Sequence, residues 1–270
     1  MQELVIEAGR MNRQYWSDLW RYKELFYFLA WRDILIRYKQ TFAGVGWAVV
    51  RPLLTMVVLT VVFGKLAAMP SGGVPYPILV FCGMLPWQFF STAVSECGTS
   101  LVSNSALVSK VYFPRMTIPA SSVIAGLVDL LISFGLMVLV MIWYQYLPGP
   151  RVLLLPVFVL IGFCAAFGLG LWISALMVKY RDFRFIIPFF VQFGLYISPV
   201  GFTSAVVPQQ WRLVYSLNPM VGVIDGFRWA IVGGTAYWPG FALSVAIVGL
   251  VLLTGVWHFR RTERTFADVI

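Results

Sequence analysis

The feature that most constrains this chain is a series of long apolar runs separated by short polar or charged segments. Residues 152–178 contain no charged residue, and residues 117–145 contain only Asp129. A helix needs about 20 residues to cross the hydrocarbon of a bilayer. The chain is also 60% hydrophobic and only 11% charged, far from the composition of a soluble domain. The pattern therefore predicts an all-α membrane protein with a single domain over residues 1–270.

Six runs are long enough to be transmembrane helices. They cover residues 44–68, 77–97, 117–145, 152–178, 185–203 and 238–258. Residues 204–236 differ, because Pro208, Pro219 and several glycines interrupt their apolar pieces. Irregular backbone at membrane depth is tolerated only where protein or a water-filled cavity covers it. We therefore expect a re-entrant, broken helical hairpin there, acting as a gate.

Residues 16–40 mix aromatic side chains with regularly spaced charges, a density of charge that a spanning helix does not tolerate. This pattern favours an amphipathic helix lying in the membrane interface, with its basic side toward lipid headgroups. The headgroup candidates are Arg32, Arg37 and Lys39. The alternative is a soluble helix that packs on a partner protein.

The distribution of Lys and Arg predicts the orientation of the chain. With the N-terminus inside, the inner segments hold Arg10, Arg13, Arg21, Lys23, Arg32, Arg37, Lys39, Lys110, Arg115, Lys179, Arg181, Arg184, Arg260, Arg261 and Arg264. The outer segments hold only Lys65, Arg151, Arg212 and Arg228, and Arg51 falls inside a predicted helix. Both termini are therefore expected in the cytoplasm, which agrees with an even number of spans.

The sequence lacks the residue patterns typical of nucleic-acid binding, metal binding, triad catalysis and nucleotide binding. The basic residues that produce the net charge of +9 lie between and beside the apolar runs, which indicates contact with membrane lipids and not with nucleic acid. Cys82, Cys97 and Cys164 form no CxxC pair, and His258 is the only histidine, so we expect neither a metal site nor a catalytic triad. No GxxxxGK[ST] loop occurs, so the chain is expected to bind no nucleotide in that way.

The polar segment 98–115 lies between the second and third spans. A cap at Asn104 or Ser105 and a stop at Pro114 predict a short helix between them. Apolar side chains beside Lys110 and Arg115 need a cover in such a loop, which favours a docking surface over an ordinary connection. A second inner loop, residues 179–184, is too short to fold alone, and its charges are also typical of simple anchors at helix ends.

Asp129 lies in the middle of the third span, on a stripe of small and polar residues. A carboxylate at that depth normally faces protein or water. We favour a hydrogen bond across helices over a proton relay, because Glu96 is the only other acid in the first five spans. On the fourth span, small residues at every fourth position from Gly162 to Ser174 predict close helix packing.

Further channel or gate candidates lie in the segment 204–236 and on the second and fifth predicted spans. Asp225 and Arg228 are three residues apart, so they can pair on one helical face, either as part of a gate or as a local stabiliser. The aromatic candidates for a channel wall are Trp87, Phe89, Phe90, Phe193 and Tyr196. Such a set is also typical of plain packing.

Collinear phrases in the sequence resemble the membrane subunits of ABC-2 type exporters, in the branch that exports O-antigen or teichoic-acid chains. The matching phrases are WRDILIRYKQTFAGVGWAVVRPLL (31–54), VFGKLA (62–67), VPYPILVFCGMLPWQFF (74–90), LVSKVYFPR (107–115), KYRD (179–182), SPVGF (198–202) and LNPM (217–220). Arg51 departs from the uncharged polar residue expected before the proline, and we assign it no role.

The resemblance implies a homodimeric channel above two copies of a separate ATPase subunit, which would bind the ATP and magnesium. It implies that residues 98–115 form a coupling helix, with contacts to the ATPase through Leu107, Lys110, Val111, Tyr112, Phe113, Arg115, Tyr180, Arg181 and Asp182. It further implies that a polyprenyl-pyrophosphate-linked polysaccharide crosses the cytoplasmic (inner) membrane.

Two rival functions remain open on the sequence. A permease of the same fold could move a drug or a plain lipid through a lateral groove. A membrane-embedded glycosyl- or phosphotransferase would need acidic clusters on a loop, and the inner loops offer only Asp182.

Overall fold

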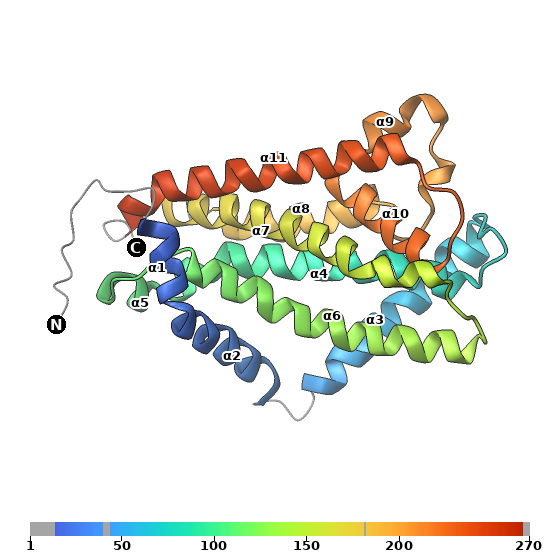
Figure 1. The fold of residues 1–270 in the computed structure, drawn as a ribbon. Coiled ribbons are helices and arrows are strands. Elements are labelled where there is room, and N and C mark those ends of the chain that lie inside the picture. Colours follow the sequence, from blue (N-terminus) through green and yellow to red (C-terminus); the bar gives the residue numbers. More distant parts are fainter. Residues whose placement is uncertain (1–13, 40–43, 181, 267–270) are drawn as a thin grey trace.

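The computed structural model describes residues 14–39, 44–180 and 182–266, and all their regular structure is helical. The long helices α4 (Tyr76–Ser103), α6 (Thr117–Trp143), α7 (Leu155–Lys179) and α11 (Trp238–Thr262) run side by side along the bundle (Figure 1). A fifth long helix consists of α3 (Gly44–Leu59) and the π-helix η1 (Thr60–Leu66). These five are long and apolar enough to cross a membrane. The predicted all-α membrane fold is confirmed.

The predicted fifth span is a shorter apolar helix, α8 (Phe183–Ile197). At 15 residues it is about 22 Å long, which is less than the hydrocarbon thickness. Its Pro188 removes one backbone donor, and the chain leaves the helix at Ser198 in an extended conformation. The predicted range 185–203 was therefore too long at its C-terminal end.

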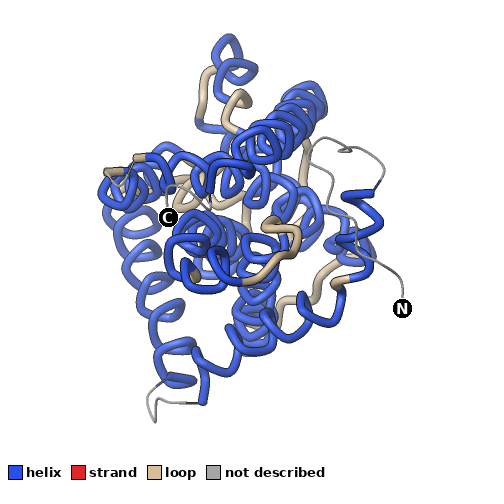
Figure 2. The backbone as a smooth tube through the Cα atoms, turned by 90° about the vertical axis from the view of Figure 1, so that its left-hand side faces the viewer, coloured by secondary structure: helices blue, strands red, loops and turns tan. Residues whose placement is uncertain are grey.

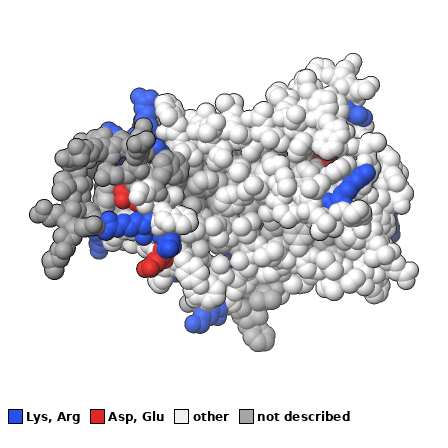
Figure 3. All heavy atoms as spheres, viewed as in Figure 1, with Lys and Arg blue, Asp and Glu red and all other residues white. Residues whose placement is uncertain are grey.

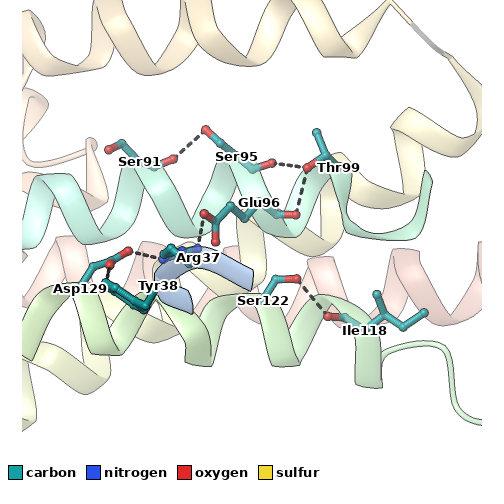
Figure 4. Close-up of polar contacts among 9 residues, drawn as sticks. All are labelled: Arg37, Tyr38, Ser91, Ser95, Glu96, Thr99, Ile118, Ser122 and Asp129. Atoms are coloured by element: carbon teal, nitrogen blue, oxygen red, sulfur yellow. Dashed lines mark hydrogen bonds and ion pairs between the residues drawn. The ribbon is translucent and has the colours of Figure 1, made fainter. Parts of the chain in front are cut away.

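Helix α4 is the centre of the bundle. Of its most apolar stretch, 78% is buried, against 11–39% for the other four long helices. It packs most extensively on α7 and α6, and also on α10 (Pro219–Ile231). Its polar residues Ser91, Ser95 and Thr99 donate to carbonyls of their own helix, so they enter the bundle without unsatisfied hydroxyls (Figure 4).

Small residues set the spacing between the central helices. A side chain at Gly170 of α7 would meet the Cβ of Cys97 on α4 at 2.7 Å, so the predicted small-residue stripe of this helix packs inside the protomer. A second contact was not predicted: Gly255 of α11 faces the carbonyl oxygen of Gly168 on α7. Both partners there are backbone atoms, and they cannot turn aside as a side chain can.

The N-terminal segment forms two helices, α1 (Gln14–Arg21) and α2 (Lys23–Lys39), where one helix over 16–40 was predicted; Gln40 lies outside the described residues. Helix α2 packs along α6. Its other side exposes large aromatic residues, among them Tyr27, Phe28 and Trp31. The segment is thus apolar on two sides, one toward the bundle and one toward its surroundings.

One end of the bundle, here called the basic end, gathers α1, the short helix α5 (Ser105–Lys110), the last turns of α7 and α11, and η5 (Glu263–Thr265) (Figure 1). A small buried cluster unites it, with Leu29, Phe113, Phe259 and Phe266 in contact. Figure 2 looks along the bundle from this end and shows helices and loops only. On the face shown in Figure 3, Lys and Arg gather at the basic end, and a broad band without visible charge separates it from the opposite end.

The opposite end, here called the far end, carries the irregular segment. It consists of 3₁₀ turns η3 (Ser204–Val206) and η4 (Gln209–Trp211), the single turn α9 (Arg212–Tyr215) and α10. Helix α9 protrudes from the bundle (Figure 1), whereas α10 is buried between α4, α7 and α11. A second 3₁₀ turn, η2 (Pro150–Leu154), precedes α7 at the same end.

The close backbone contact between α7 and α11 gives a test of the fold. We expect Gly255→Ala to lower the free energy of unfolding by about 1–3 kcal/mol, because its methyl group would overlap the Gly168 carbonyl. Thermal unfolding of the purified protein in detergent measures the change. Gly249→Ala on the same helix is the matched control, since nothing lies within 4 Å of its new methyl group. Equal melting temperatures for the two variants would contradict the packing described here.

Candidate functional site

An ionic cluster joins three helices between the basic end and the middle of the bundle (Figure 4). Arg37 of α2 donates from Nη2 to Glu96 Oε1 on α4 and from Nη1 to Asp129 Oδ2 on α6. The hydroxyl of Tyr38 donates to the second oxygen of Asp129. All three charged side chains are partly buried. The cluster fixes the end of α2 to the two helices that form the centre of the bundle.

The cluster corrects one prediction. Arg37 was expected to bind lipid headgroups, but its guanidinium lies between two carboxylates and is used within the protein. Asp129 does bond across helices, as expected, although the sequence did not reveal its partners on a segment 91 and 92 residues away. The only available signal was that Glu96 and Asp129 are the acids of the first spans and require a cation. Arg32 pairs with Asp33 and donates to Asn104, whereas Lys39 is exposed.

At the basic end the structure separates the predicted coupling residues into two groups. Lys110, Val111 and Tyr112 are exposed, the last two by 50% and 64%. Phe113 is buried in the cluster with Leu29 and Phe259, so its prediction as a docking side chain is wrong. The helix lies where predicted, at Ser105–Lys110.

The remaining predicted coupling residues also divide between surface and interior. Leu107 packs partly against the buried cluster, and Arg115 bonds to Glu263 through both its backbone N–H and its guanidinium. Tyr180 and Asp182 are exposed, with the Lys179 ammonium over the Tyr180 ring at 5.3 Å. Arg181 lies outside the described residues. Among the predicted coupling residues that the structure describes, the exposed ones are therefore Lys110, Val111, Tyr112, Tyr180 and Asp182.

Helix α1 is held to the basic end by Tyr15. The guanidinium of Arg260 lies 4.6 Å above its ring. Burial, followed by the charge of nearby Glu263, raises the pKa of Tyr15 far above its ordinary value. Tyr15 therefore stays a neutral phenol at any physiological pH.

Arg228 is the most deeply buried cation at the far end. Its Nη1 donates to Phe202 O at 2.6 Å, its Nη2 to Val200 O at 2.7 Å and its Nε to Leu79 O at 3.3 Å. One side chain thus joins α10 to α4 and to the extended chain after α8. Gly83 of α4 makes room for it, because a Cβ there would lie 2.7 Å from Nη2.

The predicted Asp225–Arg228 ion pair is not found among the ion pairs of the described residues. The guanidinium instead turns toward three backbone carbonyls. A spacing of three residues places both groups on one helical face, but the carbonyls of Val200 and Phe202, which lie outside any helix, compete for the arginine. Both residues still belong to one structural unit at the far end.

The aromatic channel candidates also divide into two sets. Trp87, Phe89 and Phe90 are 4–5% exposed and belong to the core of the protomer, which corrects their assignment to a channel wall. Phe193 and Tyr196 on α8 are exposed by 51% and 65%. Within the described parts of the chain, no group of three or more His, Cys, Asp or Glu side chains could hold a metal ion.

Comparisons with known proteins connect this chain to a family and to named relatives. Residues 24–232 match the family described as ABC-2 type transporter. An O-antigen export system permease protein RfbA from Myxococcus xanthus is 28% identical over 94% of this chain and 98% of that protein. A protein of the same name from Klebsiella pneumoniae is 23% identical over 88% of this chain and 92% of its own length. The polysialic acid transport protein KpsM from Escherichia coli is 22% identical over 82% of this chain and 89% of its own length.

The ionic cluster can be tested by removing its cation. We expect Arg37→Ala to lower the free energy of unfolding by about 1–3 kcal/mol, because two partly buried carboxylates lose their partner. A triple variant that adds Glu96→Gln and Asp129→Asn removes the unpaired charges and should recover part of the loss. Melting temperatures of the purified variants measure both effects. A triple variant less stable than the single variant would contradict the proposed cause.

The carbonyl contacts of Arg228 give a second test. We expect Arg228→Lys to lower the free energy of unfolding by at least about 2 kcal/mol, since one ammonium cannot reach three carbonyls fixed by a guanidinium fork. Arg212→Lys is the matched control, because Arg212 donates to Val207 O and Ala205 O at the surface. Yield after membrane extraction and melting temperature report the difference. A loss for Arg212→Lys as large as for Arg228→Lys would contradict this assignment.

Proposed function

This chain belongs to the ABC-2 type transporter family, and on that premise we propose that it is the membrane subunit of an ATP-driven polysaccharide exporter. In this proposal it moves a lipid-linked glycan, O-antigen or a related chain, from the cytoplasmic to the outer face of the inner membrane. Members of this family are transport subunits and not enzymes. The observation that carries the proposal is the similarity to an O-antigen export permease along nearly the whole of both chains.

The charge distribution supports an orientation with the basic end in the cytoplasm. Lys110, Lys179, Arg184 and Arg261 lie at that end, whereas Lys65, Arg151 and Arg212 lie at the far end. Cytoplasmic segments are richer in Lys and Arg than outer ones. Gln14 of α1 and Phe266 after η5 both belong to the basic end, so in this proposal both lie on the cytoplasmic side.

The ATPase subunit is proposed to dock on the exposed residues of the basic end. Val111 and Tyr112 offer apolar contact area beside the charge of Lys110, and Tyr180 and Asp182 are exposed at the same end. The chain has no GxxxxGK[ST] loop of its own, so ATP and magnesium are assigned to the partner. Two ATPase copies would serve two copies of this chain.

A homodimer is supported by the surfaces that one copy leaves uncovered. Only 11% of the apolar stretch of α3 and η1 is buried, and α8 exposes a row of aromatic side chains. Arg51 lies on the exposed side of α3, where contact with hydrocarbon would be costly. A second copy facing α3 and α8 would give Arg51 a polar channel and place Phe193 and Tyr196 along the glycan path.

Helix α2 is proposed to guide the lipid-linked substrate. Its exposed aromatic side suits the membrane interface, and Lys39 together with Arg21 and Lys23 offers cations to phosphate groups. Arg37 does not take part, because it is paired inside the bundle. A drug or plain-lipid permease remains the second candidate function of the same fold, and no feature of the described surface favours it.

The docking surface provides the test of this function. We expect Val111→Asp to weaken co-purification with the ATPase at least about tenfold and to reduce glycan export in parallel, because a charge replaces an apolar contact. Val111→Ile keeps the contact and is the matched control. Phe113→Ala, by contrast, should lower the melting temperature, since that side chain is buried. Normal delivery of glycan to the cell surface after deletion of the chain would contradict the export function itself.

A further inference from the structure

A cavity of about 600 Å³ opens at the far end of the protomer. Its wall is formed by the turn after η1, by η3, by α9 and by both the C-terminal half of α10 and the loop that follows it. Its size falls within the range of about 300–1,000 Å³ typical of small-ligand pockets. The uncovered faces of α3 and α8 contribute none of these wall segments, so the cavity is distinct from the path proposed between two copies.

The cavity wall is polar in a particular way. Asp225 presents a carboxylate, and Thr203, Ser204, Tyr215 and Thr235 present hydroxyl groups. Asp225 is the one carboxylate of this wall and takes part in none of the ion pairs among the described residues, so its oxygens keep acceptor sites. Burying such a group is costly unless it is hydrogen-bonded. The wall therefore offers one strong acceptor together with several groups that both donate and accept.

Aromatic side chains flank the same carboxylate. Asp225, Trp229 and Tyr237 line the cavity and also a small adjoining recess of about 20 Å³, so they lie where the two spaces meet. The Arg151 guanidinium covers the Trp229 ring at 5.0 Å. Tyr237 is 36% exposed and offers the more accessible ring. An apolar ring surface next to hydrogen-bonding groups matches a molecule with one apolar face and a rim of hydroxyls.

Other ligand classes fit less well. An anion would meet the Asp225 carboxylate, while both guanidinium groups of the wall are engaged with backbone carbonyls. Arg228 donates to Leu79, Phe202 and Val200, and Arg212 donates to Val207 and Ala205. A divalent metal ion would find only one carboxylate, and no metal-binding group occurs among the described residues. A lipid chain would leave the hydroxyls and the carboxylate without partners.

We propose that this far-end cavity binds a neutral sugar unit, with hydroxyls of the sugar donating to Asp225 and its ring lying against Tyr237. The inference rests on the proposed export function and adds to it an outer-face subsite inside each protomer. A glycan that has crossed the membrane would be held there by one sugar unit, either the unit that crossed first or the unit that has just crossed. Because Asp225 and Arg228 share α10, the occupied cavity is connected to the chain segment that Arg228 ties to α4.

Thiol protection in the full-length protein tests the cavity directly. Thr235→Cys places a thiol in its wall, and Leu147→Cys places one at the same end but outside it. The native Cys82 and Cys97 are buried, and the unsubstituted protein gives the background for Cys164. A membrane-impermeant maleimide is added to the protein in nanodiscs, with or without millimolar methyl glycosides of glucose, mannose, galactose and rhamnose. Oligosaccharides released by acid from the cell's own surface glycan complete the probe set.

We expect at least one probe sugar to slow labelling of Thr235→Cys about tenfold and to leave Leu147→Cys unchanged. In the Thr235→Cys background, Asp225→Asn should raise the half-protecting sugar concentration at least about tenfold, because a charged acceptor becomes a neutral amide. Tyr237→Leu should raise it similarly, while Tyr237→Phe keeps the ring and should have a smaller effect. Unchanged melting temperatures show that each variant is folded. Protection that is equal in all variants would place the sugar elsewhere and overturn the proposal.

Glycan export measured in parallel separates this inference from the function on which it rests. A protein that delivers glycan to the cell surface, but whose Thr235→Cys thiol is labelled at one rate with and without every probe, overturns the subsite alone. A chain whose deletion leaves surface glycan intact overturns the export function, whatever the labelling result.

Discussion

The structure depends on one constraint: every polar backbone group at membrane depth must find its partner inside the protein. The long helices meet this requirement through their own hydrogen bonds. The irregular chain from Ile197 to Val232 does not, and side chains supply the missing donors. Tyr215 donates to Ile197 O, Tyr76 to Gly201 O and Tyr146 to Val232 O, and Arg228 donates to Val200 O and Phe202 O. An interrupted segment can therefore remain buried against α4 and α7.

The same need for partners inside the protein explains the ionic cluster. Arg37, Glu96 and Asp129 would each be costly alone at the edge of the hydrocarbon, and together they are compatible with it. Both the ionic cluster and the carbonyl contacts of Arg228 include α4, which passes through the middle of the bundle. Arg37 attaches the substrate-guiding helix of our proposal to one half of α4, and Arg228 attaches the far-end segment to the other half. The two polar attachments therefore lie on opposite halves of one central helix.

The single protomer also shows what a second copy would complete. Its core is dense around α4, α7 and α10, yet α3 and α8 remain largely uncovered. Exposed aromatic rings on α8 and a charge on α3 are unusual neighbours for lipid alone. The far-end cavity, by contrast, is built within one chain. In the proposed exporter, the path between copies and the subsite within each copy would thus have separate structural origins.

The membrane fold, the approximate limits of most spans, the short helix at 105–110 and the family could all be predicted from the sequence. These follow from local properties: run length, capping residues and collinear phrases. The sequence could not determine that α2 folds onto α6, that Arg37 serves Asp129, that Phe113 is buried or that Arg228 prefers carbonyls to Asp225. It also failed to reveal the cavity, whose wall comes from four separate segments. Each of these points depends on which of several groups, distant in the sequence, forms a given hydrogen bond or fills a given buried space. Local sequence patterns do not contain that information, and the tertiary structure does.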